Sequence, residues 1–256
     1  MIKKLCLATA AIGVACAVYA SGPVMAQKAD DSKERGNGLL GPIVDSSDAP
    51  YGKKQCSIPK STLGQVQSAL DEVVASGNGG LFTPNMMWLS IVDRQGVLCL
   101  VTRSNAGGAP SDAWPGSRAI AIAKASTAND FSNYKNALST ANLYGPTQPG
   151  GSLFGLNNSN PFNPQFNAQG TGLGFVPGGI ITFGGGVALY PAKGGKVIGG
   201  LGVSGDTSCA DHAVAYRVRA RLGLDQTPNS DNISYAATGN GFTQPYCLGA
   251  GKDIIP

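Results

Sequence analysis

The chain has 256 residues, and its 19 Lys and Arg against 15 Asp and Glu give a formal net charge of +4 at pH 7. It contains neither a basic run nor a block of aromatic residues interleaved with arginine, which argues against a nucleic-acid partner. The length fits one domain with extensions, or at most two small ones. Apart from the N-terminal segment, no stretch is apolar enough to predict a transmembrane segment.

The N-terminus has the pattern of a signal peptide. Lys3 and Lys4 precede an uncharged apolar run over residues 5–20, and small residues follow up to Ala26. This run of about 16 residues is shorter than the roughly 20 that a spanning helix needs. We therefore expect a signal peptide over residues 1–26 and an exported protein, periplasmic or secreted.

The cysteines fit an oxidising compartment. Two of the six lie in the predicted signal peptide, and an even number remains: Cys56, Cys99, Cys209 and Cys247. Disulfides are the expected state for such a set, and four cysteines allow three pairings. We expect Cys56 with Cys99 and Cys209 with Cys247. No C-x-x-C motif occurs, so a structural zinc site has little support.

The first predicted elements follow a polar arm over residues 27–56, which is rich in glycine and proline. Apolar residues at helical spacing predict a helix that starts after Pro59 and ends at Gly77. Two apolar runs over residues 86–92 and 97–102 are separated by a short turn segment that contains glycine. They predict a β-hairpin.

The second half of the chain carries fewer periodic segments. An alanine-rich helix is predicted over residues 119–131, and its alanines imply close packing against a neighbour. Residues 144–174 are irregular, and a connection of that length is usually functional or mobile. The remaining predictions are a second hairpin from residues 179–183 and 187–190, a strand over 196–204, a helix over 207–222 and a tail over 225–256. This order favours an antiparallel sheet covered by helices.

Gly200, Gly202 and Gly205 form a literal G-x-G-x-x-G between the last predicted strand and helix. A dinucleotide site needs a further parallel strand after that helix, and none is predicted. Glycines in a strand instead let another backbone or a flat ligand approach closely. Ser204 and Gly205 also precede a helix start, where N–H groups favour a carboxylate or another anion; a plain helix cap is the alternative.

Three stretches resemble the GlcG/HbpS-like family of haem-binding or haem-degrading proteins. Residues 121–131 are similar to the family's I-A-x-x-K-A-x-T-A-x-x-F motif, residues 178–187 to its glycine-rich hairpin, and residues 197–205 to V-I-G-G-I-G-V-S-G. With the first helix and hairpin, the resemblance extends over a domain of residues 57–224. It implies an α/β (α+β) sandwich of profilin-like type, with an antiparallel sheet of about five strands flanked by helices, and assembly into homo-oligomers.

The resemblance also implies a small-molecule ligand in a pocket between sheet and helices, with haem as the cofactor of exported members. Lys124 and Thr127 lie in the family's K-A-x-T-A motif, near that pocket. We expect a haem propionate near Ser204 and Gly205. His212 is the only histidine, so it is the expected metal ligand, oriented by Asp211. Alternatives to His212 as the ligand are Met86, Met87, a tyrosine, a cysteine or no protein atom at all.

Three hypotheses for function stay open at this point. The first is an exported haem-binding protein. The second is an enzyme acting on a small carboxylated or aromatic metabolite, with His212 and Asp211 as the acid–base pair, although the chain lacks G-x-S-x-G and H-E-x-x-H. The third is an oligomeric interaction module that uses its two arms. The alternative for His212 is that it has no role in binding or catalysis and is a partly exposed residue in the first turn of the last helix.

Overall fold

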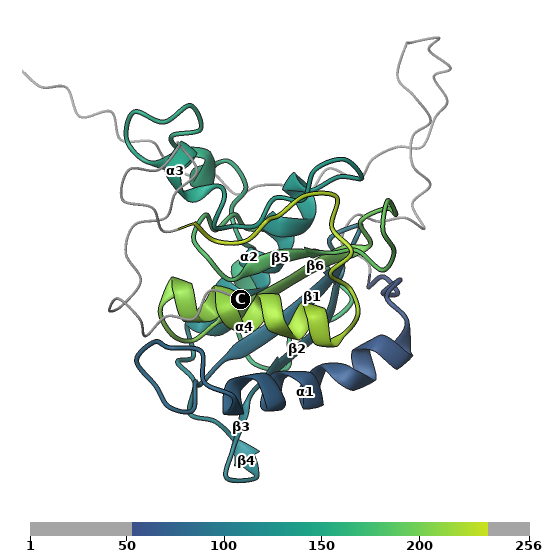
Figure 1. The fold of residues 1–256 in the computed structure, drawn as a ribbon, viewed down its shortest axis with the longest axis vertical. Coiled ribbons are helices and arrows are strands. Elements are labelled where there is room, and N and C mark those ends of the chain that lie inside the picture. Colours follow the sequence, from purple (N-terminus) through teal and green to yellow (C-terminus); the bar gives the residue numbers. More distant parts are fainter. Residues whose placement is uncertain (1–52, 235–256) are drawn as a thin grey trace, which may run out of the picture. The chain divides into compact units, whose positions relative to one another are not determined.

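The computed structural model describes residues 53–234 (Figure 1). The predicted signal peptide, nearly all of the predicted N-terminal arm and the end of the predicted tail lie outside these residues. In chain order the elements are α1 (Lys60–Ala75), β1 (Trp88–Asp93), β2 (Leu98–Arg103), β3 (Asn105–Ala106), β4 (Ala109–Pro110), α2 (Ser117–Phe131), α3 (Tyr144–Thr147), η2 (Leu156–Asn158), η3 (Pro164–Phe166), β5 (Gly186–Leu189), β6 (Gly199–Ser204) and α4 (Ser208–Arg221).

The main sheet has four strands in the order β2-β1-β6-β5. Each pairing is antiparallel, with Trp88 of β1 opposite Arg103 of β2 on one side and Ser204 of β6 on the other. The predicted first hairpin and the antiparallel sheet are thus confirmed. β3 and β4 form a separate two-stranded ribbon. The main sheet has one strand fewer than the five expected.

The missing strand belongs to the predicted second hairpin, which was wrong. Residues 179–183 form no strand, although β5 follows at Gly186. Gly179 and Gly185 have φ angles of 90° and 121°, which lie outside the region that strand residues adopt. The backbone N–H of Ile181 donates to Thr127 Oγ1 at 2.9 Å. A side chain of α2 therefore holds this apolar segment in place of a neighbouring strand.

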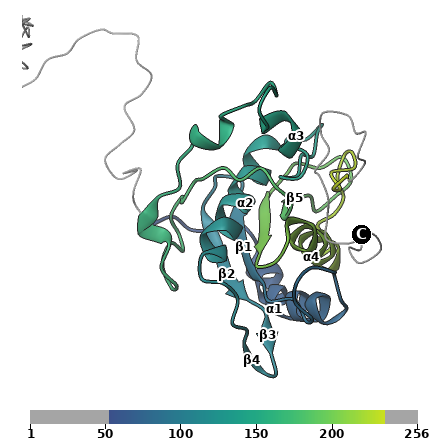
Figure 2. The ribbon, with the colours of Figure 1, turned by 90° about the vertical axis from the view of Figure 1, so that its left-hand side faces the viewer.

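The sheet lies between two helical layers, which Figure 2 shows from the side. α2 packs on one face, while α4 packs on the other and contacts α1. A Cβ at Gly200 or Gly202 would lie about 2 Å from the carbonyl oxygen of Ala125 (2.1 Å) or Ala121 (2.0 Å). The β6 glycines therefore admit the backbone of α2, and the predicted close packing of its alanines is confirmed. The intervening Leu201 and Val203 join the main core on the opposite face.

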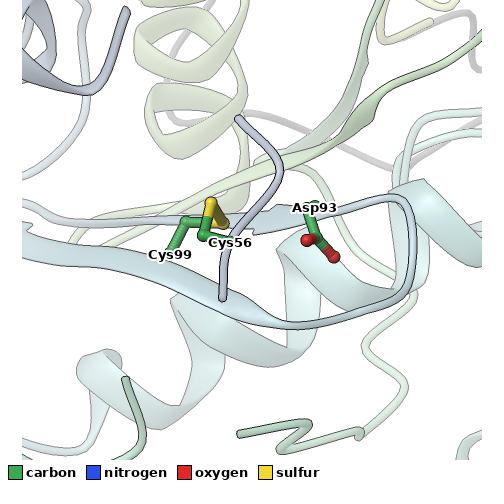
Figure 3. A group of neighbouring side chains, drawn as sticks. All are labelled: Cys56, Asp93 and Cys99. Atoms are coloured by element: carbon green, nitrogen blue, oxygen red, sulfur yellow. A yellow bond between two sulfur atoms is a disulfide. The ribbon is translucent and has the colours of Figure 1, made fainter. Parts of the chain in front are cut away.

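The predicted disulfide between Cys56 and Cys99 is confirmed. It ties the segment before α1 to β2, and Asp93 lies beside it (Figure 3). Asp93 Oδ2 accepts hydrogen bonds from the backbone N–H and the hydroxyl of Ser57, both at 3.0 Å. Since both sulfurs are bonded to each other, this group offers no thiolate to a metal ion. Cys247 lies outside the described residues, so its pairing with Cys209 stays a prediction.

None of the helices in residues 53–234 combines the length and the hydropathy needed to cross a membrane.

Candidate ligand-binding site

Lys124 and Asp211, two of the predicted pocket residues, form a buried ion pair. Lys124 reaches from α2 around the start of β5 to α4, where its Nζ lies 2.6 Å from Asp211 Oδ2. The same Nζ donates to the carbonyl oxygen of Val203 at 3.1 Å. Gly185 leaves room for this contact, because a Cβ there would lie 2.8 Å from Lys124 Nζ. We call this arrangement the Lys124–Asp211 pair.

The second carboxylate oxygen of Asp211 closes the helix start. Asp211 Oδ1 accepts the backbone N–H groups of Gly205 at 3.1 Å and Asp206 at 2.9 Å. The sequence predicted that N–H groups here would hold a carboxylate of the ligand. They hold a carboxylate of the protein itself. Burial raises the pKa of Asp211 to about 6, against the opposing effect of Lys124, and burial lowers the pKa of Lys124.

His212 is fully buried, with 0% of its surface exposed, so the expected partly exposed position was wrong. Its Nε2 accepts the backbone N–H of Ile233 at 3.1 Å, and its Nδ1 is buried without a hydrogen-bond partner in the part of the chain that the structure describes. Burial lowers the pKa of His212 to about 4, so the imidazole is neutral at pH 7. Nε2 is therefore occupied by a backbone N–H, and the structure gives His212 no exposed surface.

The remaining predicted residues also have partners within the protein. Thr127 Oγ1 donates back to the carbonyl of Ala123 at 2.7 Å and accepts the N–H of Ile181. Ser204 is buried at the end of β6. The structure therefore brings Lys124, Asp211 and Gly205 together, whereas Thr127 and His212 bond to other segments.

A cleft lies elsewhere, at β2, which is an edge strand of the sheet. Its volume is about 290 Å³. Residues from α1, β1, β2, the β3–β4 ribbon, the start of α2 and the loop before β5 line it; they are Gln67, Trp88, Val101, Thr102, Arg103, Asn105, Pro110, Arg118, Gln169, Gly170, Thr171 and Leu173. We call it the β2 cleft. A concave site where several elements converge is the usual setting for a ligand.

Arg118 and Trp88 line the β2 cleft, and each has a buried donor without a hydrogen-bond partner in residues 53–234. Arg118 is 2% exposed; its Nη1 donates to the carbonyl of Phe166 and its Nη2 to that of Thr171 at 2.6 Å, while its Nε has no partner. Burial lowers the pKa of Arg118. Trp88 is 4% exposed, and its indole Nε1 is buried without an acceptor. The guanidinium of Arg103 lies 5.5 Å from the centre of the Trp88 ring.

The β2 cleft carries no acidic residue of its own. None of its lining residues is Asp or Glu, and neither Arg103 nor Arg118 forms an ion pair with any residue in 53–234. Asp71, the nearby acid, has both oxygens occupied by Gln67 and Asn105 at 2.7–3.1 Å. Of the residues in 53–234, two arginines and no acidic residue line the cleft, which suits an anionic ligand.

Sequence reasoning missed this cleft. It named neither Trp88 nor Arg118 as a ligand-binding residue; Trp88 is part of a small core cluster with Ala113 and Ala121. The available signal was a charged side chain in the first turn of an alanine-rich helix whose following residues are apolar, because arginine is almost never fully buried without a partner. Nothing in the sequence linked that arginine to Trp88 on a distant strand.

A second cavity of about 290 Å³ lies between the end of α1 and the loop that follows it. Its lining includes Asn78 and Asn85, whose buried side chains bond to each other and to backbone carbonyls. Its polar groups are thus mutually satisfied, and they leave little with which to orient a ligand.

A family model described as "Haem degrading protein HbpS-like" matches residues 67–220, more than half of the chain. The protein therefore belongs to the HbpS-like family, as its motifs indicated. The matched segment runs from within α1 to within α4 and includes Gln67, Trp88, Arg103 and Arg118 of the β2 cleft.

Three solved structures are similar to the chain. A PduOC:heme complex is 28% identical, covering 64% of this chain and 93% of that one, with a TM-score of 0.46. Protein ORFY of Klebsiella pneumoniae is 24% identical, covering 67% and 94%, with a TM-score of 0.48. HbpS is 17% identical, covering 68% and 95%, with a TM-score of 0.43. No curated protein matches the sequence.

Proposed function

We propose that this protein binds haem at the β2 cleft. The observation that carries the proposal is the cleft itself, where two arginines without acidic partners meet a tryptophan, in a chain of the HbpS-like family. Haem has two carboxylates on one edge of a flat apolar ring. Arginine is the residue best suited to bind carboxylates, and Trp88, Val101 and Leu173 offer apolar surface to the ring.

The lining residues fit the edge of haem better than its iron. At about 290 Å³, the cleft is smaller than a whole porphyrin, so the propionate edge enters and the rest of the ring stays outside. Among residues 53–234, no His, Cys, Met or Tyr lines the cleft, so none of these lining residues is a common axial ligand. Bound haem would supply a redox-active iron. The part that we assign to this chain is the binding and orientation of the porphyrin edge.

A haemin titration of the purified protein, followed by its absorption spectrum in the oxidised and reduced states, tests the proposal. We expect a saturable Soret shift that ends at a fixed stoichiometry. The Arg221→Gln variant is the matched control for arginine substitutions in the cleft and should bind haemin like the wild type. Arg221 is an exposed arginine of α4 that pairs with Glu72 and does not line the cleft. Weak and unsaturable binding by the wild-type protein would refute the proposal.

A small carboxylated aromatic metabolite is the second candidate ligand. The cleft volume favours it, since about 290 Å³ lies close to the lower end of the range for pockets that enclose small ligands. Competition separates the two candidates. If haem is the ligand, a small aromatic carboxylate displaces haemin only at high excess, and a stoichiometric displacement favours the metabolite.

We also propose that the protein is exported and forms homo-oligomers. The signal-peptide pattern of residues 1–26 and the Cys56–Cys99 disulfide support export. Support for self-association comes from exposed apolar side chains, including Leu81 at 58% and Trp114 at 49%. Cell fractionation tests the location, and light scattering after size-exclusion chromatography tests the mass. Retention in the cytoplasm or a monomeric mass would contradict the respective proposal.

A further inference from the structure

Two unpaired donors line the same cleft. In residues 53–234, six buried side-chain atoms lack a hydrogen-bond partner, and two of these six, Trp88 Nε1 and Arg118 Nε, belong to residues of the β2 cleft. Buried N–H groups in folded proteins are nearly always hydrogen-bonded. Both N–H groups are themselves buried, so an acceptor in the cleft reaches them only when neighbouring side chains of the lining shift.

The Arg118 guanidinium is held in place before any ligand arrives. Its two terminal nitrogens donate to the carbonyls of Phe166 and Thr171, so the loop before β5 fixes the plane of the group. Nε is the one nitrogen of the Arg118 guanidinium that has no acceptor in residues 53–234. A donor fixed in this way binds a ligand at a low cost in side-chain entropy.

The charge of the cleft selects the class of acceptor. Arg103 adds a second guanidinium, no acid lines the cleft, and Asp71 is fully occupied. An anion is therefore favoured over a neutral carbonyl. A carboxylate is planar and accepts several hydrogen bonds, and the apolar side chains of Val101 and Leu173 in the lining suit a carboxylate that is attached to an apolar group.

We propose that the β2 cleft is a carboxylate-binding site, in which Trp88 Nε1–H and Arg118 Nε–H donate to the carboxylate and Arg103 supplies further positive charge. Its link to haem rests on the proposed function, because a haem propionate is one source of this group and a free aromatic carboxylate is the other. The proposed site itself requires only a carboxylate, which both sources carry.

The first experiment observes the indole N–H of Trp88 directly. The chain has two tryptophans, so its ¹H–¹⁵N spectrum contains two indole resonances, and the Trp88→Phe variant identifies one of them. We expect benzoate to shift the Trp88 resonance saturably, whereas benzamide leaves it in place. No shift with benzoate, or an equal shift with inorganic phosphate, would overturn the proposal.

The second experiment compares haemin with haemin dimethyl ester, in which both propionates are blocked. The proposal predicts that Trp88→Phe weakens haemin binding by about tenfold and leaves ester binding unchanged, because the variant removes an N–H but keeps an aromatic ring. Trp114→Phe is the matched control, since Trp114 is exposed, packs against Phe82 and does not line the cleft. Wild-type protein that binds the ester as tightly as haemin would overturn the proposal.

The two experiments separate the two claims. If haemin does not bind but benzoate shifts the Trp88 resonance, the carboxylate site stands and the haem function fails. If haemin binds but benzoate shifts nothing and the ester binds equally well, haem binding itself stands, whereas the carboxylate site and the placement of the haem propionates in the β2 cleft are refuted.

Discussion

The Lys124–Asp211 pair and the β2 cleft are both polar regions beside the sheet, but their hydrogen bonds are completed differently. In the pair, the ammonium, the carboxylate and backbone groups are hydrogen-bonded to one another. In the cleft, Trp88 and Arg118 keep unpaired N–H groups beside an open volume. The comparison teaches that Lys124 and Asp211, two of the predicted pocket residues, connect α2, β6 and α4 through their hydrogen bonds. We expect the ligand site where donors are left without acceptors.

The largest expected effect comes from breaking the pair. Lys124→Met leaves the carboxylate of Asp211 buried without its counter-ion, and we expect a loss of about 3–5 kcal/mol in the free energy of unfolding. Lys135→Met is the control, because Lys135 is exposed. Within residues 53–234, its side chain interacts only with the ring of Tyr134. Urea denaturation measures both. A Lys124→Met protein of wild-type stability would contradict the structural role of the pair.

The pH dependence of stability gives the next largest effect. The pKa of His212 is lowered to about 4 in the folded protein, against about 6.5 in the unfolded chain. As the pH falls below 6.5, the unfolded chain binds a proton that the folded protein refuses. About 3 kcal/mol of stability is therefore lost between pH 6.5 and pH 4.

His212→Gln isolates this contribution, because glutamine does not titrate and its oxygen can accept the N–H of Ile233. Asp211 acts in the opposite direction: its raised pKa lets the folded protein bind a proton first, which adds stability as the pH falls through 6. The free energy of unfolding is measured against pH for both proteins, and the difference between the two curves is the contribution of His212. Parallel curves would refute its assignment as a buried neutral imidazole.

Thr127→Val tests a single hydrogen bond, which the backbone N–H of Ile181 donates to Thr127 Oγ1. The substitution keeps the shape of the side chain but removes the acceptor for the N–H of Ile181. Leaving that N–H unpaired costs about 1–3 kcal/mol. Ser68→Ala is the control and is expected to cost less than about 0.5 kcal/mol, because Ser68 is exposed on α1. Thermal unfolding followed by circular dichroism measures both, and equal effects would contradict the role given to Thr127.

Arg103→Gln produces the smallest change in stability, since the Arg103 side chain is half-buried and stacks over Trp88 without forming an ion pair in residues 53–234. We expect less than about 0.5 kcal/mol in the free energy of unfolding. Haemin affinity should fall by about tenfold, because the positive charge that Arg103 supplies to the bound carboxylate is lost. Isothermal titration checks the affinity, and an unchanged value would remove Arg103 from the site.

The elements that the sequence predicted correctly are those whose apolar residues pack in the sheet or in the main core. α1, the β1–β2 hairpin, α2, β6 and α4 all lie close to their predicted bounds. The segment at residues 179–183 has the apolar composition of a strand, but Thr127 of α2 takes the N–H of Ile181. Such competition between a side chain and a strand depends on tertiary contacts, which local patterns do not contain.

The site was harder to predict than the fold for a related reason. Lys124 and Asp211 stood out as polar residues in a recognisable motif and at a helix start, but the sequence did not show that they would satisfy each other. The cleft residues lie on separate elements between Gln67 and Leu173 and share no motif. Their defining property, two N–H groups without acceptors, arises only when the chain is folded.

The absorption spectrum of the haemin complex of His212→Gln tests most directly whether the ligand site is the β2 cleft or the interior around His212. Our account predicts a Soret band, in the oxidised and reduced states, that matches the wild-type complex in position and in the haemin concentration at half saturation. Loss or displacement of that band in the folded variant would place the iron at His212 and contradict the account.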